Sequence, residues 1–234
     1  RPTVWVRWGA AQAITAGDGL WALAHHCLGR LAEAGTSLER VAAAYKLLDE
    51  ACLLLCEGQY LDIRFQEQPQ VSEDDYLDMI AKKTGALMAA SVKLGALVAG
   101  AAPDLVAALG EFGQRLGLAF QIRDDVLGIW GVDEATGKVG EDLAQGKKTL
   151  PVIYALGTSA APELAPLFQP GGATPSEVAR AQTALDRVGA RDYAQGVAHR
   201  YLDDALAILR PLPIGASARD ELSQVTTFLV EREY

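Results

Sequence analysis

The stretch that decides how this chain is interpreted reads Phe120-Gln121-Ile122-Arg123-Asp124-Asp125-Val126-Leu127-Gly128-Ile129-Trp130-Gly131. Apolar residues over 112–120 recur at helical spacing, which predicts that a helix runs into this stretch. Asp124 and Asp125 follow Gln121 by three and four residues, so the three side chains occupy neighbouring positions on that helix. Gly128 and Gly131 favour an end of the helix soon afterwards. The stretch is therefore predicted to present an amide and two carboxylates near a helix C-terminus.

The adjacent carboxylates of Asp124 and Asp125 are unfavourable at this position. They repel each other, and the negative end of the helix dipole adds a few tenths to about 1 kcal/mol per charge. A hard divalent cation such as Mg²⁺, bound by one or two carboxylates and completed by water and phosphate oxygens, would relieve the repulsion. The alternative is a solvated pair at a fraying helix end. For two aspartates alone this plainer interpretation is favoured, and the lysines farther along the chain shift the balance.

The composition bounds the fold class. Half of the 234 residues are hydrophobic, which is enough for a sizeable core. Alanine and leucine dominate, while runs of β-branched residues are few, and this predicts an all-α protein. A formal net charge of -9, with a pI near 4.9, argues against a nucleic-acid surface. Cys27, Cys52 and Cys56 show no metal-ligand spacing, and we interpret them as buried thiols in a reducing cytoplasm.

Two features concern membranes and the start of the chain. No apolar run reaches membrane-spanning length, because Lys93 and the Pro103-Asp104 pair interrupt the longest one, and no signal peptide is recognised. We therefore expect a cytoplasmic protein. The chain opens at Arg1 without a methionine, directly in a lead-in to a helix, so we expect that its natural N-terminus lies upstream.

The apolar periodicity predicts a succession of helices. We expect them over residues 3–33 and 38–66, from the end of the acidic segment 72–75 to a break at Pro103, through the stretch quoted above, and over 175–188, 191–209 and 217–232. Residues 158–176 are rich in proline, glycine and alanine and are predicted to form a loose loop. The sequence shows no internal repeat and no clear domain boundary.

Polar residues interrupt the predicted core faces of two helices. On the second helix the apolar face continues through Gln59 and Asp62, and on the third the inward stripe contains Lys83 and Thr84. Polar groups on a core face either find partners or line a wet cavity. For Lys83 the alternative is a side chain that runs past the edge of the stripe into water, which is common.

A glycine-punctuated loop over residues 131–142 carries Lys138, and residues 143–151 then restart a helix through Pro151. This restart contains Lys147 beside Gly146. Such lysines could neutralise the carboxylate pair, but a lysine next to a glycine in a loop more often serves an anion.

Five short motifs carry a resemblance to a known family. They are Gly58-Gln59-Tyr60-Leu61-Asp62, Lys83-Thr84-Gly85, Phe120-Gln121-Ile122-Arg123-Asp124-Asp125, Thr136-Gly137-Lys138 and Gly146-Lys147-Lys148-Thr149-Leu150-Pro151. In this order they resemble the trans-isoprenyl diphosphate synthases, the polyprenyl synthetases that include farnesyl and geranylgeranyl diphosphate synthases. Each motif alone is weak, whereas the ordered set is specific. The resemblance covers the whole chain.

The resemblance implies a fold and a metal site. The fold is an isoprenoid-synthase-like, all-α helical bundle around a central cavity, with residues 1–234 forming a single polyprenyl synthetase domain, the C-terminal portion of the full family domain. Asp124 and Asp125 would hold Mg²⁺ bridged to the diphosphate of an allylic substrate. Three lysines would bind that diphosphate and stabilise the leaving pyrophosphate: Lys83, Lys138 and Lys147.

The remaining roles follow from the same resemblance. Thr84 and Gln121 would place a hydroxyl and an amide dipole beside the developing allylic cation, and Gln59 and Asp62 would line the cavity. Heterolysis of a C–O bond needs charge stabilisation on the phosphates and a dry apolar pocket for the cation, so this assignment agrees with the chemistry. Isopentenyl diphosphate would then attack the cation and lose a proton. The implied function is Mg²⁺-dependent prenyl transfer from an allylic diphosphate to isopentenyl diphosphate.

The chain departs from the family pattern in two ways. The last place of the family's Asp-Asp-x-x-Asp motif is Gly128, as in many bacterial members. The first aspartate-rich motif is absent, although Arg1-Pro2-Thr3-Val4-Trp5 resembles the segment that follows it, so the chain carries half of the expected metal site. We expect the missing half upstream of Arg1.

Two alternatives and one partner expectation accompany this interpretation. A class I terpene cyclase shares the fold and the metal–diphosphate chemistry, but the lysine motifs favour chain elongation. A non-catalytic subunit of a prenyl synthase is the other alternative. The family implies a homodimer, and a first helix rich in small residues and carrying Trp5, Trp8 and Trp21 would suit that interface, although intramolecular packing explains it equally well.

Overall fold

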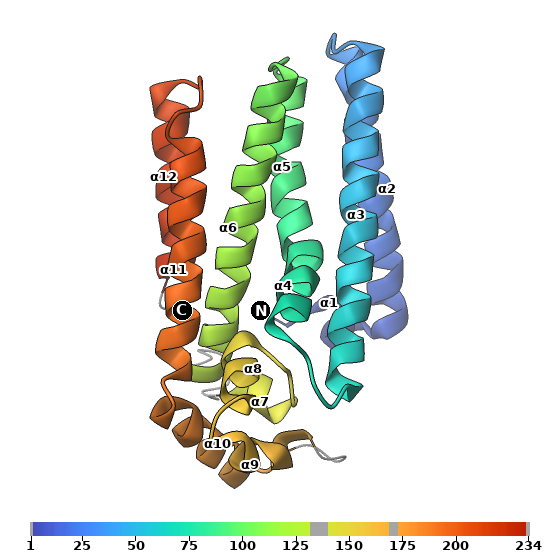
Figure 1. The fold of residues 1–234 in the computed structure, drawn as a ribbon. Helices are drawn as coiled ribbons and strands as arrows, with labels where there is room; N and C mark the ends of the chain where they lie inside the picture. The colour runs from blue at the N-terminus through green and yellow to red at the C-terminus, as the bar shows by residue number, and fades with distance from the viewer. Residues whose placement is uncertain (1, 132–139, 169–172, 233–234) are drawn as a thin grey trace.

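The computed structural model describes residues 2–131, 140–168 and 173–232, and within these ranges every regular element is a helix. The prediction of an all-α fold is confirmed. In Figure 1 the long helices stand side by side with roughly aligned axes, from α2 and α3 on one flank to α11 and α12 on the other. The short elements α7 to α10 gather at one end of the bundle.

The helices have the following bounds: α1 Val4–Trp8, α2 Ala10–Glu33, α3 Leu38–Glu67, α4 Glu73–Ile80, α5 Ala86–Val98, α6 Pro103–Trp130, α7 Glu141–Ala144, α8 Leu150–Leu156, α9 Ala161–Leu164, α10 Pro175–Arg187, α11 Ala190–Leu209 and α12 Ala216–Glu231. A π-helical turn, Ala81–Gly85, joins α4 to α5, and a 3₁₀ turn, Ala165–Phe168, follows α9. The predicted helices over 38–66, 175–188, 191–209 and 217–232 are confirmed to within one residue at each end.

Helix α6 is the centre of the core. It packs against α5 on one side and α11 on the other, and its Phe112, Ala119 and Ile122 are completely buried. Its apolar cluster extends over α4, α11 and α12. The helix ends where the sequence predicts, with Gly131 as the residue after its last turn. Asp124 and Asp125 therefore lie in the last two turns of the most buried helix.

A second apolar cluster fills the end of the bundle where the short helices meet. Ile129 at the end of α6 packs there with completely buried leucines of α7, α9 and α10. This cluster packs α7, α9 and α10 against the end of α6. The site described below borders the first cluster, which supplies Tyr76, Met79 and Ile80 to its lining.

Glycines bring three helices unusually close beside the π-helical turn. A Cβ atom on Gly58 of α3 would overlap the backbone nitrogen of Lys83. A Cβ atom on Gly117 of α6 would lie 2.5 Å from the Cα atom of Gly85. Since neither position has room for a side chain, the backbones of α3 and α6 pack directly against the turn. The residues between them, Lys83 and Thr84, are placed by backbone packing.

The widened turn itself is supported by a side chain of α6. Gln114 Nε2 donates a hydrogen bond of 3.0 Å to the carbonyl oxygen of Ala81. A π-helical turn loses the regular α-helical hydrogen-bond register, and such turns occur frequently at functional sites. The Lys83-Thr84 pair that interrupts the apolar stripe thus lies within the irregular turn.

Three local predictions are wrong. The helix expected over 3–33 is broken at Gly9, whose φ of 85° lies in the left-handed region that favours glycine. The loop expected over 158–176 contains α9 and the 3₁₀ turn, because Leu164 and Leu167 bury their side chains in the second apolar cluster. The cysteines are not buried: two are exposed and Cys52 is intermediate.

In the part of the chain that the structure describes, no helix is both long and apolar enough to span a membrane.

Candidate active site

A small cavity opens between α3, α4, α6 and the segment that leads into α8. It is lined by a mixture of charged, polar and apolar side chains: Asp62, Tyr76, Met79, Ile80, Lys83, Gln121, Asp125, Lys147, Lys148 and Thr149. These residues come from four separate stretches of the sequence. Asp62 of α3 and Lys83 of the third predicted helix thus meet the end of α6 in one place.

Two lysines at the cavity are neutralised by carboxylates. Lys83 Nζ donates to Asp62 Oδ2 at 2.7 Å, and Lys147 Nζ donates to Asp142 Oδ1 at 2.6 Å. Lys83 and Lys147 keep 32% and 35% of their side chains exposed, so both pairs can exchange partners with a solute. Burial lowers the pKa of Lys147, but the hydrogen bond to Asp142 and the negative charges of Asp142, Asp125 and Asp62 together raise it by more, so the net shift is upward. The Lys147 ammonium group therefore keeps its charge at neutral pH.

A chain of hydrogen bonds holds a second group of polar side chains at the cavity. Thr84 Oγ1 donates to Gln121 Oε1 at 2.6 Å, and Gln121 Nε2 donates to Asp125 Oδ1 at 3.0 Å. Tyr76 Oη donates to the other carboxylate oxygen, Asp125 Oδ2, at 2.5 Å. Each oxygen of this buried carboxylate therefore has a donor from the protein.

The electrostatics of Asp125 follow from this setting. The pKa of Asp125 is raised to about 7. Burial is the main cause of the rise, and the hydrogen bonds from Tyr76 and Gln121 partly oppose it. The negative charges of Asp142 and Asp124 add to the increase. Burial beside Asp125 in turn raises the pKa of the Tyr76 phenol well above its usual value, so the phenol remains a donor.

Asp124 lies at the rim and has a different partner. Its side chain is 54% exposed, and its Oδ1 accepts a hydrogen bond of 2.7 Å from Arg232 Nη2, just beyond α12. Partial burial raises the pKa of Asp124, the Arg232 charge lowers it, and the charge of Asp142 raises it again. Arg123 Nη2 donates to the Arg232 carbonyl at 2.6 Å, and the Arg232 guanidinium lies 4.4 Å from the centre of the Phe120 ring. The end of α12 is thus fastened beside the aspartate pair.

The Asp142 carboxylate lies directly against Gly128. A Cβ atom on Gly128 would overlap Asp142 Oδ2, so the carboxylate of α7 occupies the space in which a side chain at 128 would begin. Asp142 raises the pKa of both Asp124 and Asp125 through its charge. Three carboxylates thus concentrate negative potential at the end of α6.

The donor chemistry fits a hard divalent cation. Asp124 and Asp125 offer carboxylate oxygens, the ligands that Mg²⁺ takes, together with water and phosphate oxygens. A bound cation would relieve the electrostatic cost that raises both pKa values. Within residues 2–131, 140–168 and 173–232, no group of three or more His, Cys, Asp or Glu side chains is arranged to hold a metal. The pair therefore offers two protein ligands, and the remaining ligands must come from elsewhere.

The structure places most of the residues singled out in the sequence together. Five of them line the cavity or touch a residue that does so, besides Asp125: Asp62, Lys83, Thr84, Gln121 and Lys147. Asp124 lies at the rim and is not among the lining residues. Lys138 lies outside the described residues.

Gln59 does not lie where it was expected. It is exposed and does not line the cavity. Gly58 faces the π-helical turn, and the next residue of a helix points about 100° away from it. Of the two residues that the resemblance assigns to the cavity lining, Asp62 lies there and Gln59 does not.

Three residues at the site were missed. Tyr76 lies two helical turns before Lys83 on the same face, a spacing that could have identified it. Asp142 follows a glycine-rich loop and gave no signal. Lys148 is buried, and its Nζ donates to the carbonyl oxygens of Phe65 and Gln66 at 2.9 and 3.1 Å.

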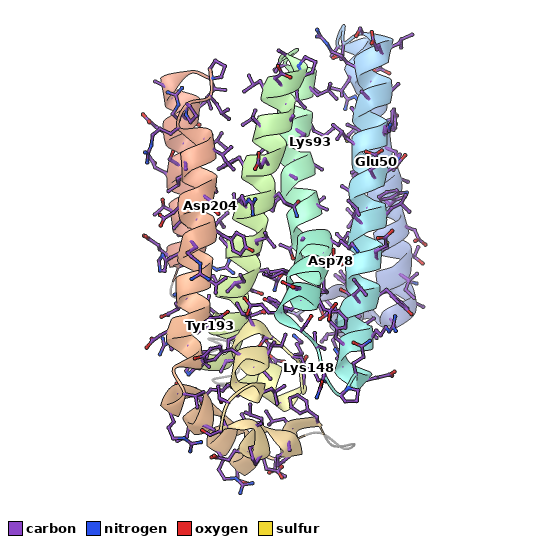
Figure 2. The ribbon with its side chains drawn as sticks, viewed as in Figure 1. Glu50, Asp78, Lys93, Lys148, Tyr193 and Asp204 are labelled. Atoms are coloured by element: carbon purple, nitrogen blue, oxygen red, sulfur yellow. The ribbon has the colours of Figure 1, made fainter. Side chains whose placement is uncertain are left out.

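Lys148 has a structural role. Burial lowers its pKa, and its ammonium lies 4.7 Å from the centre of the Phe168 ring. The two carbonyls that it binds belong to the last turn of α3, where a positive charge is favourable. Figure 2 shows Lys148 beside α8, near the end of α3. It fastens the segment that carries Lys147 to the bundle.

The chain matches the model of one protein family and resembles several of its characterised members. Residues 1–186 match the model described as polyprenyl synthetase. A geranylfarnesyl diphosphate synthase of Aeropyrum pernix is 40% identical over 233 residues, which cover 99% of this chain and 73% of that protein. The crystal structure of a geranylgeranyl pyrophosphate synthetase from Pyrococcus horikoshii superposes with a TM-score of 0.87 at 36% identity and covers 100% of this chain and 71% of its own.

A third similar protein was crystallised with ligands. It is a geranylgeranyl pyrophosphate synthase from Corynebacterium glutamicum, complexed with isoprenyl diphosphate and magnesium. Its TM-score is 0.84 at 28% identity, and the match covers 97% of this chain and 64% of that protein.

Proposed function

Because the chain belongs to the polyprenyl synthetase family, we propose that its cavity binds the diphosphate of an allylic substrate for condensation with isopentenyl diphosphate. Members of this family are trans-prenyltransferases that act on diphosphates and generally use divalent metal ions. The observation that carries the proposal is the meeting of Lys83 and Lys147 with the Asp125 end of α6 in one cavity. The product is a longer prenyl diphosphate, in a short-chain synthesis.

The metal in this proposal is Mg²⁺, held by Asp124 and Asp125. Hard carboxylate oxygens at a site of concentrated negative potential support it. The magnesium named with the Corynebacterium glutamicum relative supports it as well. When bound, the ion neutralises charge that develops on the diphosphate oxygens. Arg232, which now holds Asp124, must then share that carboxylate or release it.

The lysines hold the diphosphate and stabilise it as it leaves. Lys83 and Lys147 exchange their carboxylate partners, Asp62 and Asp142, for phosphate oxygens. The gain grows as the C–O bond breaks, because the departing pyrophosphate gathers negative charge within reach of both ammonium groups. We assign Lys138 to the same anion on its motif alone.

The other side of the cavity serves the carbon end of the substrate. Thr84 and Gln121 orient hydroxyl and amide dipoles beside the developing allylic cation, while Met79 and Ile80 provide an apolar lining. Heterolysis of the allylic C–O bond gives the cation and pyrophosphate. The double bond of isopentenyl diphosphate attacks the cation, and a proton then passes to the pyrophosphate to form the new double bond.

A product assay tests the function directly. The protein is incubated with Mg²⁺, isopentenyl diphosphate and an allylic diphosphate, and the products are separated by chain length. A prenyl diphosphate longer by five-carbon units supports the proposal. Turnover of the allylic diphosphate without isopentenyl diphosphate would instead indicate a terpene cyclase. No turnover of either kind would contradict the proposal that this chain catalyses the condensation.

The assembly in this proposal is a homodimer of single helical domains. Helices α1 and α2 carry a group of exposed large apolar side chains: Val4, Trp5, Val6, Trp8, Ile14, Leu20, Trp21 and Leu23. Such a group suits burial against a second copy. Light scattering after size exclusion measures the mass, and a monomer at micromolar concentration would contradict the dimer.

A further inference from the structure

We propose that Tyr76 is a positioning residue that locks the Asp125 carboxylate into one orientation and so prepares the aspartate pair for its cation. The inference rests on the proposed function, in which Asp124 and Asp125 hold the metal. It adds a residue from another helix, α4, which makes no contact with the substrate in that mechanism. Its basis is a buried hydrogen bond that joins α4 to the end of α6.

Tyr76 is itself held rigidly. Only 1% of its surface is exposed, and its ring belongs to the apolar cluster around α6. Helix α4 begins with a capping box in which the Ser72 side chain accepts from the Asp75 backbone and the Asp75 side chain accepts from the Ser72 backbone. This reciprocal bonding fixes the first turn of the helix, and Tyr76 is the residue after Asp75. The phenol oxygen therefore has a set position before any ligand binds.

Asp125 has little freedom once these bonds form. Only 6% of it is exposed, and its two oxygens accept from donors on different sides, Gln121 Nε2 at 3.0 Å and Tyr76 Oη at 2.5 Å. Thr84 fixes the orientation of the Gln121 amide in turn, by donating to its oxygen. Without the phenol oxygen, the carboxylate plane can rotate, and the remaining bond to Gln121 no longer determines it.

A fixed carboxylate matters because each oxygen keeps a further lone pair for a cation. Groups that orient a metal ligand commonly change metal affinity by about 10- to 100-fold when they are removed. Loss of the Tyr76 hydroxyl is therefore expected to weaken cation binding by about tenfold or more. If the Tyr76 hydroxyl only satisfied the buried Asp125 carboxylate, its removal would change the stability of the protein and leave the cation affinity unaltered.

The chain offers a matched control. Tyr193 Oη of α11 donates to Glu73 Oε2 of the same helix α4 at 2.6 Å. Its ring stacks on Tyr154, with the ring centres 4.2 Å apart, on the α11 side of the bundle (Figure 2). Tyr193→Phe removes the same kind of tyrosine–carboxylate bond from the same helix without touching the aspartate pair.

The experiment measures Mn²⁺ binding, by electron paramagnetic resonance of the free ion, in the presence of inorganic pyrophosphate. Wild type, Tyr76→Phe and Tyr193→Phe are compared, with the melting temperature of each recorded. We expect a Kd about tenfold or more higher for Tyr76→Phe and within about twofold of wild type for Tyr193→Phe. If wild type binds Mn²⁺ and the Kd of Tyr76→Phe lies within twofold of the wild-type Kd, this inference is overturned and the proposed function is not. A wild type that binds no Mn²⁺ overturns the proposed function and this inference with it.

A double-mutant cycle covers the case of an unstable single variant. If Tyr76 acts through Asp125, then Tyr76→Phe should add no further loss of Mn²⁺ affinity in an Asp125→Asn background. Removal of the buried charge also removes the need to satisfy it, which favours folding of the double variant. An additional loss equal to that of the single variant would show that Tyr76 acts by another route and would overturn the inference.

Discussion

The two sides of the cavity hold their polar groups in different ways. On one side, a continuous chain of hydrogen bonds links Thr84, Gln121, Asp125 and Tyr76, and the Asp125 carboxylate within it is buried. On the other side, Lys83–Asp62 and Lys147–Asp142 are partly exposed ion pairs. We call these the hydrogen-bonded side and the ion-paired side.

The ion pairs can exchange a carboxylate for a ligand, whereas the buried hydrogen bonds stay in place. A partly exposed ion pair contributes little net stability, so an anionic ligand can replace the carboxylate at small cost. Buried hydrogen bonds are expensive to break, because each leaves an unsatisfied group out of reach of water. The ion-paired side is therefore suited to binding the diphosphate, and the hydrogen-bonded side to keeping the geometry. Substitutions on the two sides should accordingly separate activity from stability.

The largest expected effect is on catalysis, for Lys83→Met on the ion-paired side. Methionine keeps much of the aliphatic length and the helix propensity, so folding should change little. The loss of one charged donor to the leaving group should lower kcat/KM by about two to three orders of magnitude, or about 2.7–4 kcal/mol. Steady-state kinetics with isopentenyl and allylic diphosphates measure it. A loss below about fivefold at an unchanged melting temperature would remove Lys83 from the catalytic residues.

The next effect concerns pH and the hydrogen-bonded side. Burial raises the pKa of Asp125 from 3.8 to about 7, so the folded protein holds a proton that the unfolded chain releases. Stability from this group is present below about pH 4 and is lost as pH rises towards about 7. The melting temperature of the metal-free wild type should thus fall between pH 5 and about 8, and that of Asp125→Asn should fall less. Equal slopes for the two proteins would contradict this assignment.

A third prediction removes one donor from the hydrogen-bonded side. Gln121→Met leaves Asp125 Oδ1 without its donor and the Thr84 hydroxyl without its acceptor. The free energy of unfolding should fall by about 1–3 kcal/mol. Urea denaturation measures it, with Lys83→Met as the comparison from the ion-paired side, where the change should stay below about 1 kcal/mol. Equal losses for both variants would erase the distinction between the two sides.

The smallest expected effect is a gain. Asp62→Asn weakens the internal competitor for Lys83, so inorganic pyrophosphate should bind about two- to fivefold more tightly, or about 0.4–1 kcal/mol. Isothermal titration calorimetry measures the affinity. The matched substitution Glu50→Gln relaxes an exposed ion pair with Lys46, at 3.7 Å, and should change nothing. Weaker pyrophosphate binding by Asp62→Asn would mean that this carboxylate helps to hold the ligand.

The sequence was sufficient for the parts of the fold and of the site that depend on local spacing. The end of α6 at Gly131 followed from periodicity and glycine placement, as did the bounds of α3 and α10 to α12. Polar residues on apolar stripes identified Asp62 and Lys83, which the fold brings to one cavity. Periodicity reports which face a residue occupies, and this was enough for both.

Features that depend on contacts between distant segments were out of reach. The π-helical turn needs Gln114 of α6 to bind the Ala81 carbonyl and Gly58 of α3 to admit the Lys83 backbone. Asp142 joins the site only because α7 folds back over Gly128. The resemblance assigns Gln59 to the cavity lining, but the structure leaves Gln59 exposed beside Gly58, which faces the π-helical turn. None of these follows from the spacing within a single helix.

The central claim, that one diphosphate lies between the two lysines, is tested most directly by pyrophosphate binding. Calorimetry with Mg²⁺ and inorganic pyrophosphate compares wild type with Lys83→Met and Lys147→Met. The control is Lys46→Met, whose side chain is 75% exposed on α3. Binding through both ammonium groups predicts a Kd about tenfold or more higher for each cavity variant, which is about 1.4 kcal/mol, and an unchanged Kd for the control. Affinities within twofold of wild type for both cavity variants would contradict the claim.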